Sequence, residues 1–553
     1  MGPAAHRHHA EPGRLIYQRG FDPRIDYDDS QVERLRAAMA SQPGILLWSH
    51  RSNLDTLVLG AALQEKGLPA AHLFAGINMA FGPMGAIMRR AGVIFIRRST
   101  ADDPLYKLVL REYLGYVLEK RFNLSWSIEG TRSRTGKMLP PRLGLLSYAA
   151  DAYRQGRVDD LLLLPVSITF DQLHEIAEYA DYARGGQKKP EGFSWLYGFI
   201  KAQGARHYGK VYVRFGEPVP LSTFLGPPDG PTATDEDARR LALAKTAFEV
   251  AWRINQGMPV TATALITTIL LATRGTALTF AEIRLGLADA LDYLESRAIP
   301  RTASLRALSA TGPVRATLDA LRAGGLVTCA ANGREPVWLI GPDQQLAATF
   351  YRNSLIHFLL DTALCELAVL RAAEAPADPV GVFWTEIARL RDLLKFEFYF
   401  RDSGEHRRAM RTEMDRHDPS WEERLTRGEA DSLLAGMRPL VSHVIVRPFV
   451  EAYRLVADVL AHDQALAGRD EVIRQALGLG QQYVAQGRLR SAEPVSVLLF
   501  STAFQLAGNQ GLLEPGEDLA VRRAAFLAEL RGLHSRLNRI EELAIKRYLT
   551  GAG

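Results

Sequence analysis

Between residues 45 and 221, short apolar runs alternate with longer amphipathic runs, and this alternation restricts the first part of the chain to a layered α/β domain. The clearest helical run covers residues 103–120, where leucine, valine and tyrosine recur mostly every three or four residues. We therefore expect a mixed sheet flanked by helices. The predicted strands are residues 45–49, 71–77, 93–97, 124–128, 161–169 and 211–215.

Turn-forming residues at 226–231 mark a domain edge or an exposed loop, and the helical period dominates after them. At 553 residues the chain is long enough for two or three domains. We expect a short N-terminal extension (1–43), the α/β domain (44–231) and a mainly α C-terminal domain (232–553). The predicted C-terminal helices are residues 235–254, 280–296, 314–323, 344–373, 384–400, 429–461 with breaks at Pro439 and Pro448, 471–486 and 519–548.

The longest stretches without charged residues are each interrupted by glycine, proline or polar residues, so no membrane-spanning segment is expected. One of them, residues 261–273, is interpreted as a buried or interfacial helix. The excess of 67 Lys and Arg over 62 Asp and Glu favours anionic partners. A phospholipid surface and a phosphorylated substrate fit this excess, whereas motifs for nucleic-acid recognition are absent from the sequence. Cys329 and Cys365 lack metal-site spacing, and we expect no metal.

A first chemical motif, His50-Arg-Ser-Asn-Leu-Asp55, stands where a predicted strand ends and a predicted helix begins. In α/β sheets, ligands bind at this edge. On a regular helix two residues five positions apart face different directions, so His50 and Asp55 can meet only across a turn. The carboxylate would then hold one ring nitrogen and leave the other as a base. The spacing alone is a weak indication, and a surface histidine is the alternative.

Three further motifs follow predicted strands or lie within one. Arg97 and Arg98 end a strand, where one of them could bind a phosphate or both could be solvated. Residues 129–137, EGTRSRTGK, combine glycines, hydroxyls and cations around one carboxylate, although a basic surface loop is the alternative. Pro165 interrupts a hydrophobic strand, which indicates an edge strand or a shaped wall of a site.

In this order and spacing, HRSNLD, GVIFIRR, EGTRSRTGK and LLPVSI resemble the four conserved blocks of the glycerolipid (HX4D) acyltransferase superfamily. Residues 187–190 (QKKP), 209–218 (GKVYVRFGEP) and 351–353 (YRN) narrow the resemblance to the bacterial PlsB-type glycerol-3-phosphate acyltransferases and the related dihydroxyacetone-phosphate acyltransferases. The resemblance is specific from about residue 44 to 220 and looser across the C-terminal half.

The resemblance implies that His50 is the general base and that Asp55 orients and charges its imidazole. The acceptor hydroxyl would attack the thioester carbonyl directly, without an acyl-enzyme. The absence of a G-x-S-x-G motif from the sequence agrees with this route. By the same resemblance, the substrate-binding residues are the phosphate ligands Arg98 and Arg132 with Arg134 or Lys137, the residues closing the glycerol side, Glu129 and Gly130, and also Ser133 and Pro165.

The expected activity is glycerol-3-phosphate 1-O-acylation, with acyl-CoA or acyl carrier protein as donor, lysophosphatidate as product and no cofactor. The alternatives are dihydroxyacetone phosphate or a lysophospholipid as acceptor, or a catalytically silent lipid-binding scaffold. We expect peripheral attachment to an anionic membrane, at its cytoplasmic face. Only 49 residues precede His50, fewer than in long bacterial members of the family. The chain would therefore lack a docking or regulatory element, or belong to a shorter branch with another acceptor.

Overall fold

The protein divides into two compact units, one of Met1–Tyr179 with Gln187–Thr261 and the other of Ala180–Gly186 with Ala262–Gly553. The computed structural model describes residues 16–80, 82–97, 103–183, 193–273, 275–462 and 468–551. The predicted domain edge at residue 231 lies inside the first unit, because helix α11 (Glu236–Gln256) packs on a strand of that unit.

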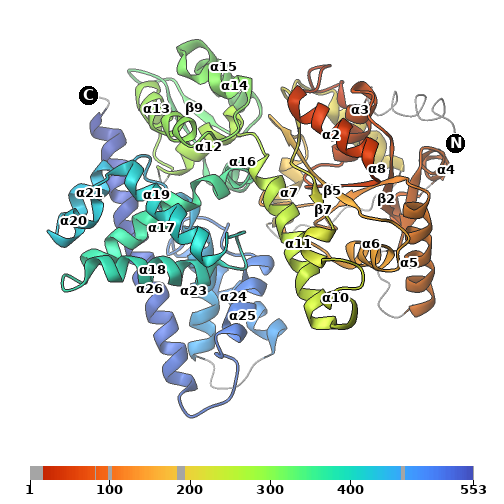
Figure 1. Ribbon diagram of the computed structural model, residues 1–553. Coiled ribbons are helices and arrows are strands. Elements are labelled where there is room, and N and C mark those ends of the chain that lie inside the picture. Colours follow the sequence, from red (N-terminus) through yellow and green to blue (C-terminus); the bar gives the residue numbers. More distant parts are fainter. Residues whose placement is uncertain are drawn as a thin grey trace. The chain divides into compact units, whose positions relative to one another are not determined.

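Among the described residues, the first unit contains a mixed seven-stranded sheet (Figure 1). Its order is β3-β2-β4-β1-β5-β6, with β7 also paired to β5. Strands β1 to β5 run parallel to their neighbours among themselves, whereas β6 and β7 are antiparallel to β5. All six predicted strands are confirmed. The bounds are β1 Gly44–Trp48, β2 Ala71–Gly76, β3 Val93–Ile96, β4 Asn123–Ser127, β5 Leu162–Phe170, β6 Val211–Phe215 and β7 Val219–Pro220.

Strand β1 lies at the centre of this sheet, between β4 and β5, and every one of its residues is buried. Trp48, its last residue, pairs with Ser127 of β4 and Val166 of β5. Because these three strands are parallel, their carboxyl ends meet at one edge, and the segments that follow them converge there. The sheet therefore brings the first and third motifs together.

Pro165 lies in an interior strand, at the point where β5 changes its antiparallel partner. Leu162 and Leu163 pair with β7, whereas pairing with β6 begins at Val166. Between them, the Pro165 carbonyl accepts the backbone N–H of Gly216 at 2.8 Å. A residue without a backbone N–H is tolerated here because β6 and β7 do not continue into each other as one strand. Of the two readings of Pro165, the edge strand is therefore wrong. Pro165 occupies a junction, and its role in binding substrate stays a prediction.

Helix α3 (Asp55–Glu65) begins at the end of the first motif, as predicted, and α5 (Pro104–Glu119) falls within the predicted run. The apolar pattern used to predict α5 does not face the sheet, however. Five of its six members are exposed, whereas the sixth, Val117, is buried together with Leu114, Gly115 and Leu118. The exposed members are Leu105, Leu108, Val109, Tyr113 and Tyr116.

The second unit is mainly helical, as predicted, with one small antiparallel sheet of order β8-β10-β9 (Leu278–Thr279, Val337–Leu339, Thr328–Ala330). Helix α17 (Ile356–Ala373) lies in its core and packs against several other helices. The remaining longer helices are α13 Phe280–Ser296, α15 Thr311–Ala323, α16 Gln345–Asn353, α18 Pro379–Leu394, α19 Ser403–His417, α23 Arg447–His462, α24 Arg469–Ala485, α25 Val497–Asn509 and α26 Leu519–Gly551.

The uncharged run 261–273 forms α12 (Ala262–Leu271), whose residues are buried from Ala262 to Leu270. Two of its threonines, Thr267 and Thr268, donate their hydroxyls to backbone carbonyls one turn earlier. Of the two readings of this run, the structure supports the buried helix. Within the described ranges, none of the helices is both long enough and apolar enough to cross a membrane.

Candidate active site

The turn between β1 and α3 brings His50 and Asp55 into contact. His50 Nδ1 lies 2.9 Å from Asp55 Oδ2, as the motif predicted. Asp55 is the first residue of α3, and the same oxygen also accepts the backbone N–H groups of Arg51 and Ser52, at 2.7 and 2.9 Å. The Asp55 side chain is fully buried, whereas that of His50 is 22% exposed. The turn thus fixes the carboxylate and leaves part of the imidazole accessible.

This geometry defines the tautomer of His50. An ionised carboxylate only accepts hydrogen bonds, so Nδ1 carries the hydrogen and donates it to Asp55. Nε2 then keeps its lone pair and is free to accept a proton. The ring also packs edge-on against Trp48, with 5.0 Å between ring centroids. Asp55 and Trp48 together set the direction in which Nε2 points.

Glu129, predicted to bind substrate, is buried beside this turn with both oxygens in use. Oε1 accepts the backbone N–H of His50 and Oε2 that of Leu139, each at 2.8 Å. Burial raises the pKa of Glu129 to about 7, although these hydrogen bonds and the Arg51 charge lower it. Glu129 therefore links the residues after β4 to the backbone of His50 through hydrogen bonds.

The loop after β4 contacts His50 through its backbone. The N–H of Ser133 donates to the His50 carbonyl at 2.8 Å, and Ser133 is fully buried. Gly130 turns the chain with φ +67°, a conformation that favours glycine. Arg134 and Lys137 are half-buried residues of the same loop. The structure brings this motif to the dyad through Glu129 and Ser133, and Arg132 reaches the same turn through another carboxylate.

That carboxylate is Glu175, which is not among the site residues predicted from the sequence. It accepts the Ser52 hydroxyl at 2.6 Å and both the backbone and side-chain N–H of Asn53 at 2.9 Å. Arg132 Nη1 lies 3.4 Å from it and 3.3 Å from the Tyr179 hydroxyl, which in turn donates to the Arg51 carbonyl. Its position just beyond the carboxyl end of β5 is the only signal in the sequence that could have indicated it.

Ser52 is not set up as a nucleophile. Its hydroxyl hydrogen is directed to Glu175 rather than to His50. A serine nucleophile needs a base within hydrogen-bond reach, but among the described residues the His50 imidazole bonds to Asp55 and not to Ser52. The site is therefore built for a base that acts directly on a bound hydroxyl.

Arg98 lies outside the described residues, so its predicted role stays a prediction. The strand before it ends at Ile96, in β3, which lies three strand positions from β1. At about 4.8 Å per strand, this separation is about 14 Å. Residues 187–190 lie outside the described ranges as well. The third resembling stretch, residues 351–353, is structural in the second unit, where buried Arg352 pairs with Glu493.

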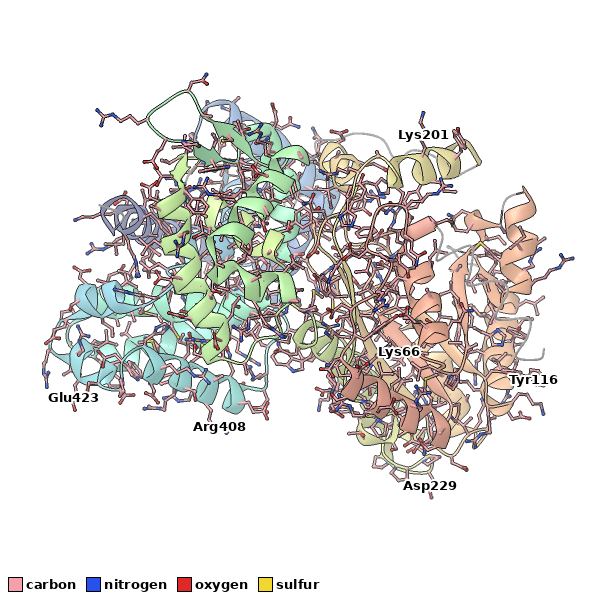
Figure 2. All side chains as sticks on the ribbon, turned by 90° about the horizontal axis from the view of Figure 1, so that it is seen from above. Lys66, Tyr116, Lys201, Asp229, Arg408 and Glu423 are labelled. Atoms are coloured by element: carbon pink, nitrogen blue, oxygen red, sulfur yellow. The ribbon has the colours of Figure 1, made fainter. Side chains whose placement is uncertain are left out.

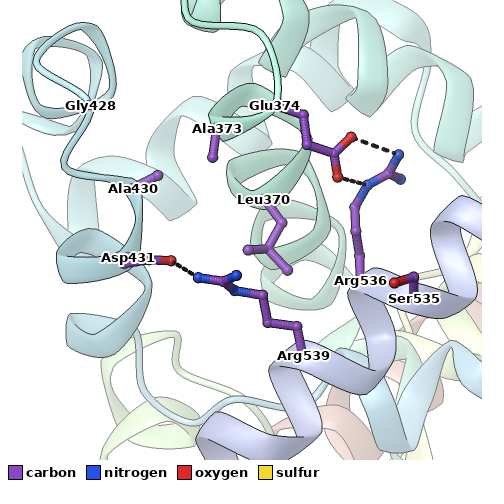
Figure 3. Close-up of a pocket in the computed structure, with 9 residues that line it drawn as sticks. All are labelled: Leu370, Ala373, Glu374, Gly428, Ala430, Asp431, Ser535, Arg536 and Arg539. Carbon is purple, nitrogen blue, oxygen red and sulfur yellow. Dashed lines mark hydrogen bonds and ion pairs between the residues drawn. The ribbon is translucent and has the colours of Figure 1, made fainter.

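The second unit contains a hollow of about 480 Å³ beside α17 and α26 (Figure 3). Arg536 faces Glu374 and Arg539 faces Asp431 across it, with the closest atoms 2.9 and 2.6 Å apart. Because these cations are neutralised by neighbouring carboxylates, the hollow offers no unpaired charge from these two residues for a ligand. In the described part of the chain, no cluster of His, Cys, Asp and Glu could hold a metal ion.

Comparisons with known proteins agree with this arrangement. The family model "Acyltransferase" matches residues 29–169, and "Glycerol-3-phosphate acyltransferase C-terminal region" matches residues 179–516. Putative acyltransferases plsB1 of Mycobacterium tuberculosis and Mycobacterium bovis are 37% identical over 542 residues, which cover 95% of this chain and 84% of theirs. A glycerol-3-phosphate acyltransferase of Glaesserella parasuis is 28% identical over 91% of this chain and 62% of its own length.

Among solved structures, the 1-acyl-sn-glycerophosphate acyltransferase PlsC of Thermotoga maritima matches 44% of this chain and 79% of its own, with 16% identity and a TM-score of 0.26. The mixed sheet, the His50–Asp55 dyad and the family matches define an enzyme of the acyltransferase class. Within that class, the chain belongs to the glycerol-3-phosphate acyltransferase family.

Proposed function

We propose that this enzyme transfers a fatty acyl group from a long-chain acyl thioester to the sn-1 hydroxyl of glycerol 3-phosphate, giving lysophosphatidate. The observation that carries the proposal is the His50 Nδ1–Asp55 Oδ2 contact of 2.9 Å, which leaves Nε2 as a base at the carboxyl edge of the sheet. Acyl-CoA or acyl carrier protein supplies the thioester, and the reaction needs no cofactor.

The chemistry follows from the free nitrogen of His50. Nε2 accepts the proton of the acceptor hydroxyl while its oxygen attacks the thioester carbonyl carbon. The tetrahedral intermediate collapses with cleavage of the C–S bond, and the imidazolium returns its proton to the leaving thiolate. Asp55 stabilises the transient positive charge on the ring. A positioned base of this kind contributes about 10² to 10⁴ in rate.

The test supplies radiolabelled glycerol 3-phosphate, dihydroxyacetone phosphate and lysophosphatidate separately, each with acyl-CoA or acyl carrier protein as donor. We expect lysophosphatidate from glycerol 3-phosphate, and a loss of nearly all turnover in His50→Ala. His207→Ala is the matched control, because His207 is an exposed histidine paired with Asp22 at the surface. Equal rates for wild type and His50→Ala would refute the base. If the enzyme prefers another acceptor, that acceptor and not glycerol 3-phosphate is its substrate.

We also propose that the enzyme attaches peripherally to an anionic membrane surface, at the cytoplasmic face, where its product dissolves. The support is the outer face of α5, defined by Leu105, Leu108, Val109, Tyr113 and Tyr116, each 46–69% exposed. Figure 2 labels Tyr116 at the periphery of its unit. A contiguous apolar and aromatic helix face of this kind is unusual on a protein surface without a partner.

The sequence segment that contains α5 is cationic, which favours lipid over a protein partner. Residues 77–122 contain eight Lys and Arg against four Asp and Glu, a net charge of +4 within a chain of +5. Ile87 is exposed on α4 (Gly82–Arg90), whose last turn holds Arg89 and Arg90. Apolar and tyrosine side chains with cations nearby suit the interface of an anionic bilayer, where each cation adds about 1 kcal/mol.

A further inference from the structure

Arg51, between the base and the rest of the turn, is a buried cation that pairs with no carboxylate among the described residues. The residue is only 4% exposed. Its Nη1 contacts the thioether of Met258, its Nε has no hydrogen-bond partner, and none of the carboxylates in the described ranges forms an ion pair with it. A guanidinium cannot lose its proton to relieve this situation, so a buried arginine needs anionic acceptors.

The two carboxylates that act on Arg51 electrostatically, Asp55 and Glu129, direct their hydrogen-bonding oxygens elsewhere. Asp55 Oδ2 accepts His50 Nδ1 and two backbone N–H groups. Both oxygens of Glu129 accept backbone N–H groups. The negative charge near Arg51 therefore helps to keep a cation in the interior, but neither carboxylate accepts a hydrogen bond from the guanidinium, whose Nε has no partner among the described residues.

Arg51 lies close enough to the dyad for its charge to act on Asp55 and Glu129. It follows His50 directly at the carboxyl edge of β1, and in glycerol 3-phosphate three carbons link the reacting hydroxyl to the phosphate. The predicted phosphate ligand Arg132 already has contacts to Glu175 and Tyr179. The strand that precedes Arg98 ends three strand positions away.

We propose that the Arg51 guanidinium binds a phosphate group of a substrate and is a binding residue of this site. The proposal rests on the proposed function for the identity of the substrate. A planar guanidinium matches phosphate oxygens bidentately, and burial beside the dyad makes this contact depend on a ligand that enters the active site. Both the acceptor and the CoA part of the donor contain phosphates, so the experiment separates these sources.

The test compares wild type with Arg51→Met and Arg51→Lys. Methionine keeps the volume of the side chain and removes the charge. We expect the midpoint of thermal unfolding without ligand to stay the same or rise in Arg51→Met, because a buried unpaired charge is lost. We expect the KM for glycerol 3-phosphate to rise at least tenfold in Arg51→Met. The KM of Arg51→Lys should lie between those of wild type and Arg51→Met.

Arg214→Met is the matched control, since Arg214 is similarly enclosed in the same unit but is paired with Asp26. This variant should lower the midpoint of unfolding and leave KM unchanged. If Arg51→Met behaves in the same way as Arg214→Met, Arg51 is a structural cation and the proposal is wrong. If only the KM for acyl-CoA rises, and no rise occurs with a phosphate-free thioester donor, the ligand of Arg51 is a phosphate of the donor.

A binding measurement keeps this proposal separate from the proposed function. Inorganic phosphate and glycerol 3-phosphate are titrated against His50→Ala, which has no turnover to complicate the result, and the midpoint of unfolding is followed. Both ligands should raise the midpoint for His50→Ala and fail to do so for His50→Ala/Arg51→Met. An equal rise in both proteins would overturn the role of Arg51 even if acylation is confirmed.

Discussion

The Glu129 carboxylate accepts the backbone N–H of His50 at 2.8 Å, and so a buried acid, rather than the sheet alone, fixes the position of the base. The other oxygen of Glu129 holds Leu139, beyond the loop that carries Arg132. This relationship ties two motifs that are about 80 residues apart, and it makes the stability of the site depend on pH.

Burial raises the pKa of Glu129 from 4.5 to about 7, so the folded protein holds a proton that the unfolded chain releases. Unfolding therefore releases this proton between pH 4.5 and 7, and the stability from Glu129 is full below pH 4.5 and lost as the pH rises through 7. The shift corresponds to about 3 kcal/mol.

Glu129→Gln should remove this pH dependence. We expect the advantage of wild type over the variant, measured by denaturant unfolding, to shrink by about 3 kcal/mol between pH 4.5 and 8. Glu33→Gln is the control, because Glu33 is 69% exposed and its substitution should leave the slope unchanged. A constant difference between wild type and Glu129→Gln over this range would contradict the assignment.

Glu175 should act as a positioning residue, because it holds Ser52, Asn53 and Arg132 without facing the reacting atoms. Glu175→Gln replaces one acceptor oxygen by a donor. Because either Ser52 or Asn53 then loses an acceptor, the turn that carries His50 should shift. Displacements of about 1 Å cost about 10² in rate, so kcat should fall by about that factor. Glu178→Gln, one turn along α7 (Ile176–Ala183) and exposed, should have no effect.

A double-mutant cycle distinguishes positioning from simple destabilisation. If Glu175 acts partly through Arg132, the losses in kcat/KM of Glu175→Gln and Arg132→Met should be strongly non-additive. Additive losses, or a fall in activity that follows the fraction of unfolded protein, would assign Glu175 a purely structural role.

Gly130 should resist substitution because its φ is +67° and an added Cβ would lie 2.9 Å from Cγ of Arg142. We expect Gly130→Ala to destabilise the protein by about 1–2 kcal/mol and to lower activity, since the next residues contact the dyad. Gly60→Ala, in α3 with open space around it, should be neutral or stabilising by about 0.5–1 kcal/mol. Thermal unfolding of both variants and assay of their activity provide the check. Similar stability of Gly130→Ala and Gly60→Ala would contradict the strain at Gly130.

The sequence predicted the six strands because each coincides with a short apolar run, and it predicted the His50–Asp55 contact because both residues lie in one turn. The prediction from sequence failed where tertiary packing determines where a helix ends or breaks. Residues 344–373 form two helices with a break at Ser354 and Leu355, and residues 396–400 lie beyond the end of α18. Helical periodicity alone does not locate such breaks, because both sides of a break carry the same pattern.

The site residues show the same limit. Glu129 belongs to a recognisable loop, but only the fold reveals that its carboxylate holds His50 and Leu139. Glu175 meets Ser52 across 123 positions of sequence. That Arg51 pairs with no carboxylate of the described ranges depends on what surrounds it in three dimensions. The apolar period of α5 indicated a helix correctly, but periodicity cannot distinguish a face that packs on a sheet from one that binds a partner.

The outer face of α5 should bind anionic bilayers. In the double variant Leu108→Glu/Val109→Glu, two exposed apolar side chains become negative, and the variant loses both apolar insertion and attraction to anionic lipid. We expect its partition into phosphatidylglycerol vesicles, measured by sedimentation, to fall at least tenfold, while thermal stability and activity on a water-soluble short-chain thioester persist. Wild type should bind phosphatidylcholine vesicles weakly and lose its anionic binding at high salt.

Leu241→Glu provides the control for this experiment, because Leu241 is 57% exposed on α11, also in the first unit, but lies outside the outer face of α5. Its vesicle binding should equal that of wild type, since a single added charge away from the docking face changes the attraction little. If the α5 variant instead retains vesicle binding and changes from dimer to monomer in solution, this face contacts a second copy of the chain and the membrane proposal is wrong.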